Sequence, residues 1–160
     1  MNKKMTRNVN KIVATISLFV AMMLCVGGCD GQVKEIDESA LAEQLVSEIE
    51  YDSKLTQVDD FMVSLYVTME EDTTGIMYMS NGATAEAVAV FTAPDEDTAV
   101  TMKDNVQFYL NDQETAFEDY MPDEAKRIQD AVLVQKGKYV ILCVTGDTQK
   151  AETIIEDAFK

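Results

Sequence analysis

A short polar segment in the middle of the chain could contact a ligand. Asn81, Gly82, Thr84 and Glu86 lie between two apolar runs that have the composition of β-strands. A rigid hairpin can present such side chains to a ligand at its tip. The same residue types also build turns, because glycine accepts a positive φ and an asparagine side chain bonds to nearby backbone. We favour the turn interpretation and keep ligand contact by these four residues as the alternative.

Pairs of acidic residues are a second source of possible chemistry. Two carboxylates at a suitable separation can act as the acid and the base of a glycoside hydrolase. The chain has 29 acidic residues, so neighbouring pairs arise by chance, and we expect most of them on solvated faces and at helix starts. No loop has the ligand spacing of an EF-hand. The sequence therefore predicts no metal site and no cofactor.

The chain lacks the usual side chains of nucleophilic catalysis. It has no histidine, which removes the commonest general base and the commonest transition-metal ligand. Cys143 lies in the apolar run 139–145, and no basic residue is closer in the sequence than Lys138. Burial in an apolar strand keeps a thiol protonated and unreactive. We expect Cys143 to be structural, and we expect the protein not to be an enzyme.

Cys29 is the residue to which the sequence assigns a definite reaction. The first eleven residues carry basic and no acidic side chains, and residues 12–26 form an apolar run, as in a secretory leader. A helix of that length spans roughly 22 Å, short of the ~30 Å core of a bilayer. The run ends in Val26, Gly27, Gly28 and Cys29, which resemble the lipobox of bacterial lipoproteins. We expect cleavage between Gly28 and Cys29 and lipidation of Cys29; the alternative is an ordinary secretory signal.

Composition limits the partners of the remaining chain. The leader holds four of the thirteen basic residues and none of the 29 acidic ones, which leaves a formal charge of −20. Such a charge disfavours nucleic acid as a partner, and it disfavours an anionic lipid surface. We expect three parts: a lipoprotein signal peptide over residues 1–28, a lipidated cysteine and tether over 29–37, and a single extracytoplasmic domain over 38–160.

Apolar periodicity predicts the helices that frame this domain. Leu41, Leu45 and Ile49 recur at four-residue spacing after Asp37, a typical N-cap residue. A long central helix is expected to start after Pro94 and to end before Pro122, and a C-terminal helix is expected after Asp147. Residues 58–67 are expected to form a shorter helix or an irregular segment.

Two hairpins complete the predicted fold. Residues 75–79 and 86–93 form the first, and residues 131–134 and 139–145 form the second, with the last strand apolar on both faces. The fold class is therefore α+β. We expect an antiparallel sheet of about four strands, packed with an N-terminal helix, a long central helix and a C-terminal helix.

Four short stretches together are similar to a known family. They are Gly-Ala-Thr-Ala-Glu at 82–86, Ala-Val-Phe at 89–91, Phe-Glu-Asp-Tyr-Met-Pro at 117–122 and Leu-Cys-Val at 142–144. The pattern resembles the Gram-positive lipoprotein family described only as domain of unknown function 4358, and the likeness covers roughly residues 38–159. This resemblance implies an extracytoplasmic lipoprotein domain. It implies no catalytic residue, because the family has no assigned activity.

The sequence thus predicts a protein held by a lipid on the extracytoplasmic face of the cell membrane. Besides the membrane, its partner is expected to be an envelope protein or a small ligand. We expect a non-enzymatic binding or accessory module of the cell envelope. The alternative is a small envelope hydrolase that uses a carboxylate pair, which would need two acids held at working distance in a concave site.

Overall fold

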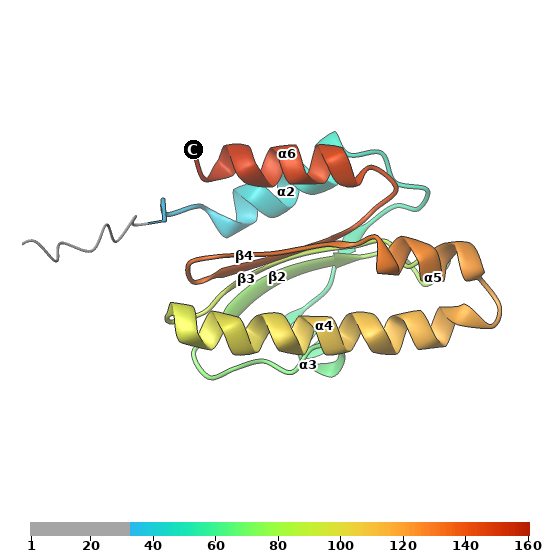
Figure 1. The fold of residues 1–160 in the computed structure, drawn as a ribbon, viewed down its shortest axis with the longest axis horizontal. Helices are drawn as coiled ribbons and strands as arrows, with labels where there is room; N and C mark the ends of the chain where they lie inside the picture. Colours follow the sequence, from blue (N-terminus) through green and yellow to red (C-terminus); the bar gives the residue numbers. More distant parts are fainter. Residues whose placement is uncertain (1–32) are drawn as a thin grey trace, which may run out of the picture. The chain divides into compact units, whose positions relative to one another are not determined.

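A five-stranded antiparallel sheet with helices on both faces forms the part of the chain that the computed structural model describes, residues 33–160 (Figure 1). These residues make one compact unit. The predicted signal peptide, its cleavage point and Cys29 lie outside the described residues. The strand order is β1-β2-β3-β5-β4. The strands are β1 (Thr56–Gln57), β2 (Thr74–Met79), β3 (Ala87–Thr92), β4 (Val132–Lys136) and β5 (Tyr139–Val144).

The helices divide between the two faces of the sheet. α2 (Glu38–Glu48) and α6 (Thr148–Ala158) cover one face, and α3 (Asp60–Tyr66) and α4 (Glu96–Glu118) lie on the other, where α5 (Pro122–Gln129) packs beside α4 (Figure 1). The α+β fold class is confirmed. The sheet has one strand more than the four expected, because β1 adds a two-residue edge strand beside β2. Among residues 33–160, no helix is long and apolar enough to cross a membrane.

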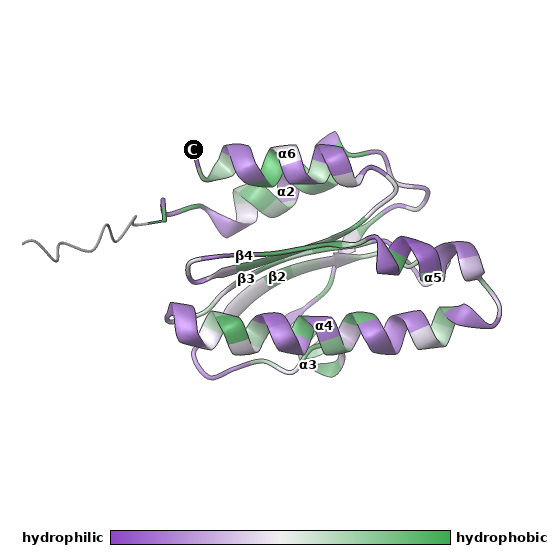
Figure 2. Cartoon of the chain, in the orientation of Figure 1, coloured by the Kyte–Doolittle hydropathy of each residue, from purple (hydrophilic) through white to green (hydrophobic). Residues whose placement is uncertain are grey.

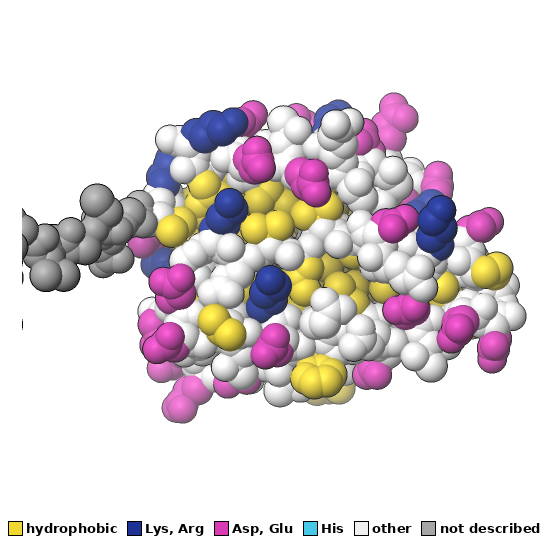
Figure 3. Space-filling model, in the orientation of Figure 1, with side chains coloured by type: hydrophobic (Ala, Val, Ile, Leu, Met, Phe, Trp, Pro, Cys, Tyr) yellow, Lys and Arg dark blue, Asp and Glu magenta, His cyan; other side chains and the backbone are white. Residues whose placement is uncertain are grey.

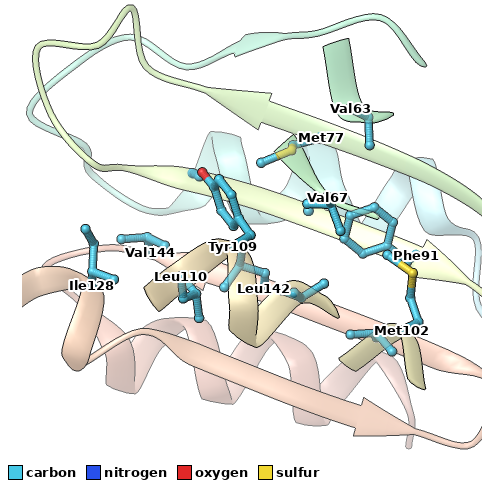
Figure 4. Close-up of a cluster of buried hydrophobic side chains, with 14 of the residues drawn as sticks. Val63, Val67, Met77, Phe91, Met102, Tyr109, Leu110, Ile128, Leu142 and Val144 are labelled. Atoms are coloured by element: carbon cyan, nitrogen blue, oxygen red, sulfur yellow. The ribbon is translucent and has the colours of Figure 1, made fainter. Parts of the chain in front are cut away.

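Each face of the sheet carries its own hydrophobic core. Strands expose alternate side chains to opposite faces, so Ile141 and Cys143 of β5 pack toward α2 and α6 while Val140, Leu142 and Val144 pack toward α4. All six residues of β5 are buried, as its apolar sequence predicts. Figure 2 shows the strands and the inner helix faces as the apolar parts of the fold. Figure 4 shows the core beneath α4, which includes Val67, Met77, Phe91, Met102, Tyr109, Leu110 and Leu142.

Aspartate caps determine where four helices begin. The carboxylates of Asp37, Asp59, Asp95 and Asp147 each accept a hydrogen bond from a backbone N–H in the first turn of the helix that follows. A cap of this kind contributes about 1 kcal/mol. The predicted starts of α2, α4 and α6 are therefore confirmed.

Helix α5 was not expected from the sequence. Met121 precedes Pro122, and a proline ends a helix that comes before it. In this chain Pro122 also occupies the first turn of a new helix, where its missing N–H would have no partner in any case. α5 consequently packs against α4 and carries two charged residues into the site described below.

Gly75 in β2 is required by the ring of Phe91 in β3. The two residues are opposite each other in the sheet, and a Cβ atom on residue 75 would lie 2.3 Å from Cδ1 of Phe91. Phe91 is completely buried. Only glycine leaves space for this aromatic ring over the strand.

The described part of the predicted tether, residues 33–37, lies against the domain. Glu35 accepts hydrogen bonds from the hydroxyl of Tyr139 (2.5 Å) and pairs with Lys138 (3.0 Å), and Ile36 N–H donates to the same hydroxyl (3.3 Å). Lys34 Nζ donates to the Ala158 carbonyl at the end of α6 (3.1 Å). These contacts, which we call the clasp, hold residues 34–36 against the β4–β5 hairpin and the end of α6.

Candidate functional site

The four residues of the predicted ligand-contact turn do not share one orientation. Asn81 accepts a bond from Ala83 N–H (3.2 Å), and Gly82 has φ +87°; both residues are exposed in the β2–β3 loop. Glu86 instead turns inward and is buried. Thr84 donates its hydroxyl proton to Glu86 Oε2 (2.9 Å). The loop therefore places two of these residues at the surface and directs the other pair into the fold.

Glu86 belongs to a buried charge cluster. Its two carboxylate oxygens accept bonds from the N–H groups of Asp52 and Ser53, each at 2.9 Å. Arg127 of α5 lies 3.3 Å from Glu86 and 3.1 Å from Glu124. We call Asp52, Glu86, Glu124 and Arg127 the Arg127 cluster; it joins the segment after α2, the start of β3 and α5.

Every charge of the Arg127 cluster has a partner. Glu124 also accepts from Ala85 N–H (2.8 Å), and Arg127 donates to Asp52 (2.5 Å). Burial by itself lowers the pKa of Arg127, but the bond to Asp52 and the charges of Glu124 and Glu86 outweigh this effect and raise it. Because Glu86 and Glu124 are occupied by backbone and guanidinium donors, the carboxylates that the fold brings together serve to hold it.

Sequence reasoning named Glu86 but not its partners. Arg127 is the one arginine of the chain outside the N-terminal segment, and Glu124 precedes it by one helical turn. A single arginine in a strongly acidic domain is a signal for a buried ion pair, since its planar fork suits carboxylates. No helix was expected between Pro122 and the second hairpin, so neither residue was assigned to an element.

Cys143 is fully buried on the α2 and α6 side of the sheet. Burial raises the pKa of its thiol to about 11, and a hydrogen bond with Tyr51 opposes that rise. The Tyr51 hydroxyl lies 3.5 Å from the sulfur and donates to the Leu45 carbonyl (3.2 Å). Burial likewise raises the pKa of Tyr51. The burial expected for this cysteine is observed, and both groups are neutral at physiological pH.

The outer side of α3 and α4 carries large apolar side chains in contact with solvent. Phe61 is 70% exposed, Leu65 62%, Tyr66 39% and Phe108 67%. We call these four residues the α3–α4 patch. Figure 3 shows apolar side chains protruding along the lower margin of the molecule, where Figure 1 places these two helices.

Two contacts connect α4 with α3 and with the segment that follows α3. The rings of Tyr66 and Tyr109 meet edge to face with centroids 6.2 Å apart. Asn105 donates to the Thr68 carbonyl (3.0 Å) just beyond α3, and Phe108 lies one turn further along the same side of α4. Acidic residues border the patch, and all are exposed: Asp59, Asp60, Asp104 and Asp112.

A pocket opens at the start of α3, beside the patch. It has a volume of about 390 Å³. Val63 and Met69 form apolar walls, and Glu38, Asp60, Thr73 and Thr74 contribute polar groups. We call it the α3 pocket. Among residues 33–160, no group of three or more histidine, cysteine, aspartate or glutamate residues is placed to hold a metal ion.

Comparison with known proteins gives a family and no activity. Neither the curated proteins nor the solved structures contain a match to this chain. One family model matches residues 47–145, from the end of α2 to the end of β5. This match covers more than half of the chain. The chain belongs to the family described as Domain of unknown function (DUF4358).

Proposed function

We propose that this chain is a membrane-anchored extracytoplasmic lipoprotein that acts as a binding module, and that it binds another protein of the cell envelope through the α3–α4 patch. The anchor is inferred from Cys29 and the leader before it. The binding role is inferred from the patch, the observation that carries the proposal.

The size of the patch favours a protein partner. Large aromatic and aliphatic side chains have about 150–250 Å² of surface each, so at the exposures given above these four offer on the order of 400 Å². The largest apolar patch of a typical monomeric protein has an area of about 300–600 Å², and such patches are often functional. Aromatic anchors with a polar border also match the composition of interface centres.

The carboxylates argue for binding over hydrolysis. A glycoside hydrolase needs one carboxyl group that can give up a proton and another that is free to attack or to activate water. Glu86 and Glu124 are the acids that the fold brings together in its interior, and both are held by Arg127 and by backbone N–H groups. Their arrangement supports a structural role.

Anchoring is tested by a single substitution. Cys29→Ser removes the sulfur that would accept the lipid, so we expect the protein to move from the membrane fraction to the medium or to accumulate unprocessed. The measurement is fractionation followed by mass spectrometry of the mature N-terminus. Normal processing with full membrane retention would contradict a lipid anchor.

Binding through the patch is tested by site-specific photocrosslinking in intact cells. A photoreactive amino acid replaces Phe108 in one variant and Val100 in the control; Val100 is 50% exposed on the same helix, about 12 Å earlier along its axis. We expect a discrete adduct from position 108 that disappears when Leu65→Ser is added. Equal adducts from both positions would show that the patch has no partner of its own.

A further inference from the structure

We infer that the partner carries a basic side chain next to its apolar surface, and that the α3 pocket receives this side chain. The inference rests on the function proposed above and adds the chemistry of the partner. Asp60 lines the pocket and directly precedes Phe61 of the patch. A segment lying on the patch can therefore reach the pocket with its next side chain.

The carboxylates of the α3 pocket have no cation of their own within the described chain. None of the ion pairs among residues 33–160 includes Glu38 or Asp60. Glu38 instead accepts hydroxyl bonds from Thr92 (2.5 Å) and, more weakly, from Thr74 (3.4 Å). Hydroxyl donors solvate a carboxylate without neutralising it, so the pocket keeps its negative charge.

A hydroxyl group in the pocket wall also lacks a partner. Thr73 Oγ1 is buried and makes no hydrogen bond, although buried polar atoms are nearly always bonded. An ammonium or guanidinium group entering the pocket would offer several N–H donors to the two carboxylates, and Thr73 Oγ1, which has almost no accessible surface, would have to rotate toward the pocket to accept one of them. Val63 and Met69 would cover its aliphatic stem. A calcium ion fits less well, because it requires six to eight oxygen ligands.

The negative charge around the patch distinguishes among three possible binding partners. A second copy of this chain would bring the acidic borders of two patches together, which is unfavourable. An anionic membrane would be repelled by the same residues. An amphipathic protein segment with basic side chains can bury its apolar face on the centre of the patch and pair its charges with the acidic border. We therefore infer that the partner is such a segment.

The test uses two synthetic amphipathic helical peptides and the purified mature chain with Cys29→Ser. One peptide consists of leucine and lysine, and the other has glutamate in place of lysine. Binding is measured by fluorescence anisotropy at several salt concentrations. We expect the lysine peptide to bind and the glutamate peptide not to bind.

Matched variants locate the contact. The double substitution Leu65→Ser and Phe108→Ser is expected to weaken binding by about tenfold or more, as for interface anchors, and Val100→Ser is expected to leave it unchanged. Asp60→Asn is expected to weaken binding of the lysine peptide and to reduce its salt dependence. Asp130→Asn, at an exposed acid that directly follows α5, is the control for overall charge.

The outcomes separate this inference from the proposed function. If the patch variants bind as well as the wild type, protein binding through the patch is refuted. If the patch variants lose binding but Asp60→Asn behaves as Asp130→Asn does, or the glutamate peptide binds equally well, only the pocket inference is refuted. Sedimentation and vesicle binding complete the test, since patch-dependent dimers or patch-dependent binding to anionic vesicles would replace the basic segment with another occupant.

Discussion

Removing the guanidinium of the Arg127 cluster should strongly destabilise the domain. Arg127→Met keeps the long stem but leaves the carboxylates of Glu86 and Glu124 without a cation, and their side chains are only 1% and 9% exposed. Breaking a buried ion pair by removing one partner costs roughly 3–5 kcal/mol. Because domains of this size unfold at about 5–15 kcal/mol, the variant should lose a large share of its stability.

The loss can be measured by thermal and denaturant unfolding. With an unfolding entropy of about 2.1 cal/mol/K per residue, a domain the length of residues 33–160 should melt roughly 10–20 °C lower in the Arg127→Met variant. Lys126→Met is the matched control, because Lys126 is the exposed neighbour on the same helix, and surface substitutions usually stay within about 0.5 kcal/mol.

A second comparison separates the buried pairs from the exposed one. Asp52 is 69% exposed in its pair with Arg127, so Asp52→Asn should cost no more than about 1 kcal/mol. If Arg127→Met cost as little as Lys126→Met, the carboxylates would not depend on the guanidinium. The structural role assigned to the pairs of Arg127 with Glu86 and Glu124 would then be refuted, and the hydrolase alternative would regain support.

Three further outcomes follow from single contacts. Gly75→Ala should cost about 1–3 kcal/mol by overpacking against Phe91, measured by urea unfolding; an unchanged midpoint would contradict the 2.3 Å approach. Cys143, with its thiol pKa raised to about 11, should resist thiol reagents at neutral pH and react only on unfolding; rapid labelling of the native protein would refute its burial. Bonds from Tyr139 and Lys138 lower the pKa of Glu35 below its ordinary 4.5, so the clasp is at full strength above that value and weakens as the pH falls through the lowered pKa. The protection of the Ile36 amide, measured as its exchange rate relative to an unstructured peptide at the same pH, should fall there, and unchanged protection would exclude this role.

Local sequence signals predicted the elements that local interactions determine. The caps at Asp37, Asp95 and Asp147 are each made within one turn, so the residues that mark a helix start are adjacent to it in the chain. The same is true of the β4–β5 hairpin, where Gly137 has φ +54° in a two-residue turn. β1 was missed because two residues are too few to show a periodicity.

The candidate site could not be predicted in the same way, because its residues meet through contacts between distant parts of the sequence. Glu86 was recognised in the sequence as a polar residue near a turn. In the structure it is buried beside Arg127 of α5, and α5 begins at Pro122, the residue that was expected only to end α4. Likewise, Phe61 and Phe108 lie far apart in the sequence, and no local pattern relates one to the other. Phe61 is exposed because α3 turns Val63 inward, and Phe108 is exposed because α4 turns Tyr109 inward.

The clasp and the patch together limit where a partner can be. Five residues, from Cys29 to Val33, precede Lys34, the first residue of the clasp. A fully extended chain of that length spans at most about 18 Å, so a lipid on Cys29 would keep the β4–β5 hairpin close to the membrane. α4 starts beside that hairpin, where Ala93 N–H donates to the Lys138 carbonyl (2.9 Å), and Phe108 lies roughly 18 Å further along the helix.

At that distance from the membrane, the patch would be within reach of a partner that is itself bound to the membrane. Two proteins held at one surface meet at an effective concentration far above their bulk value, which lets a modest contact give lasting association. An apolar area of about 400 Å² is small for two proteins that meet from free solution, whose stable interfaces bury about 800 Å² per partner. It follows that releasing the domain by Cys29→Ser should also abolish the position-108 adduct, even though the patch is unchanged. Persistence of that adduct in the released protein would show that the contact does not depend on anchoring.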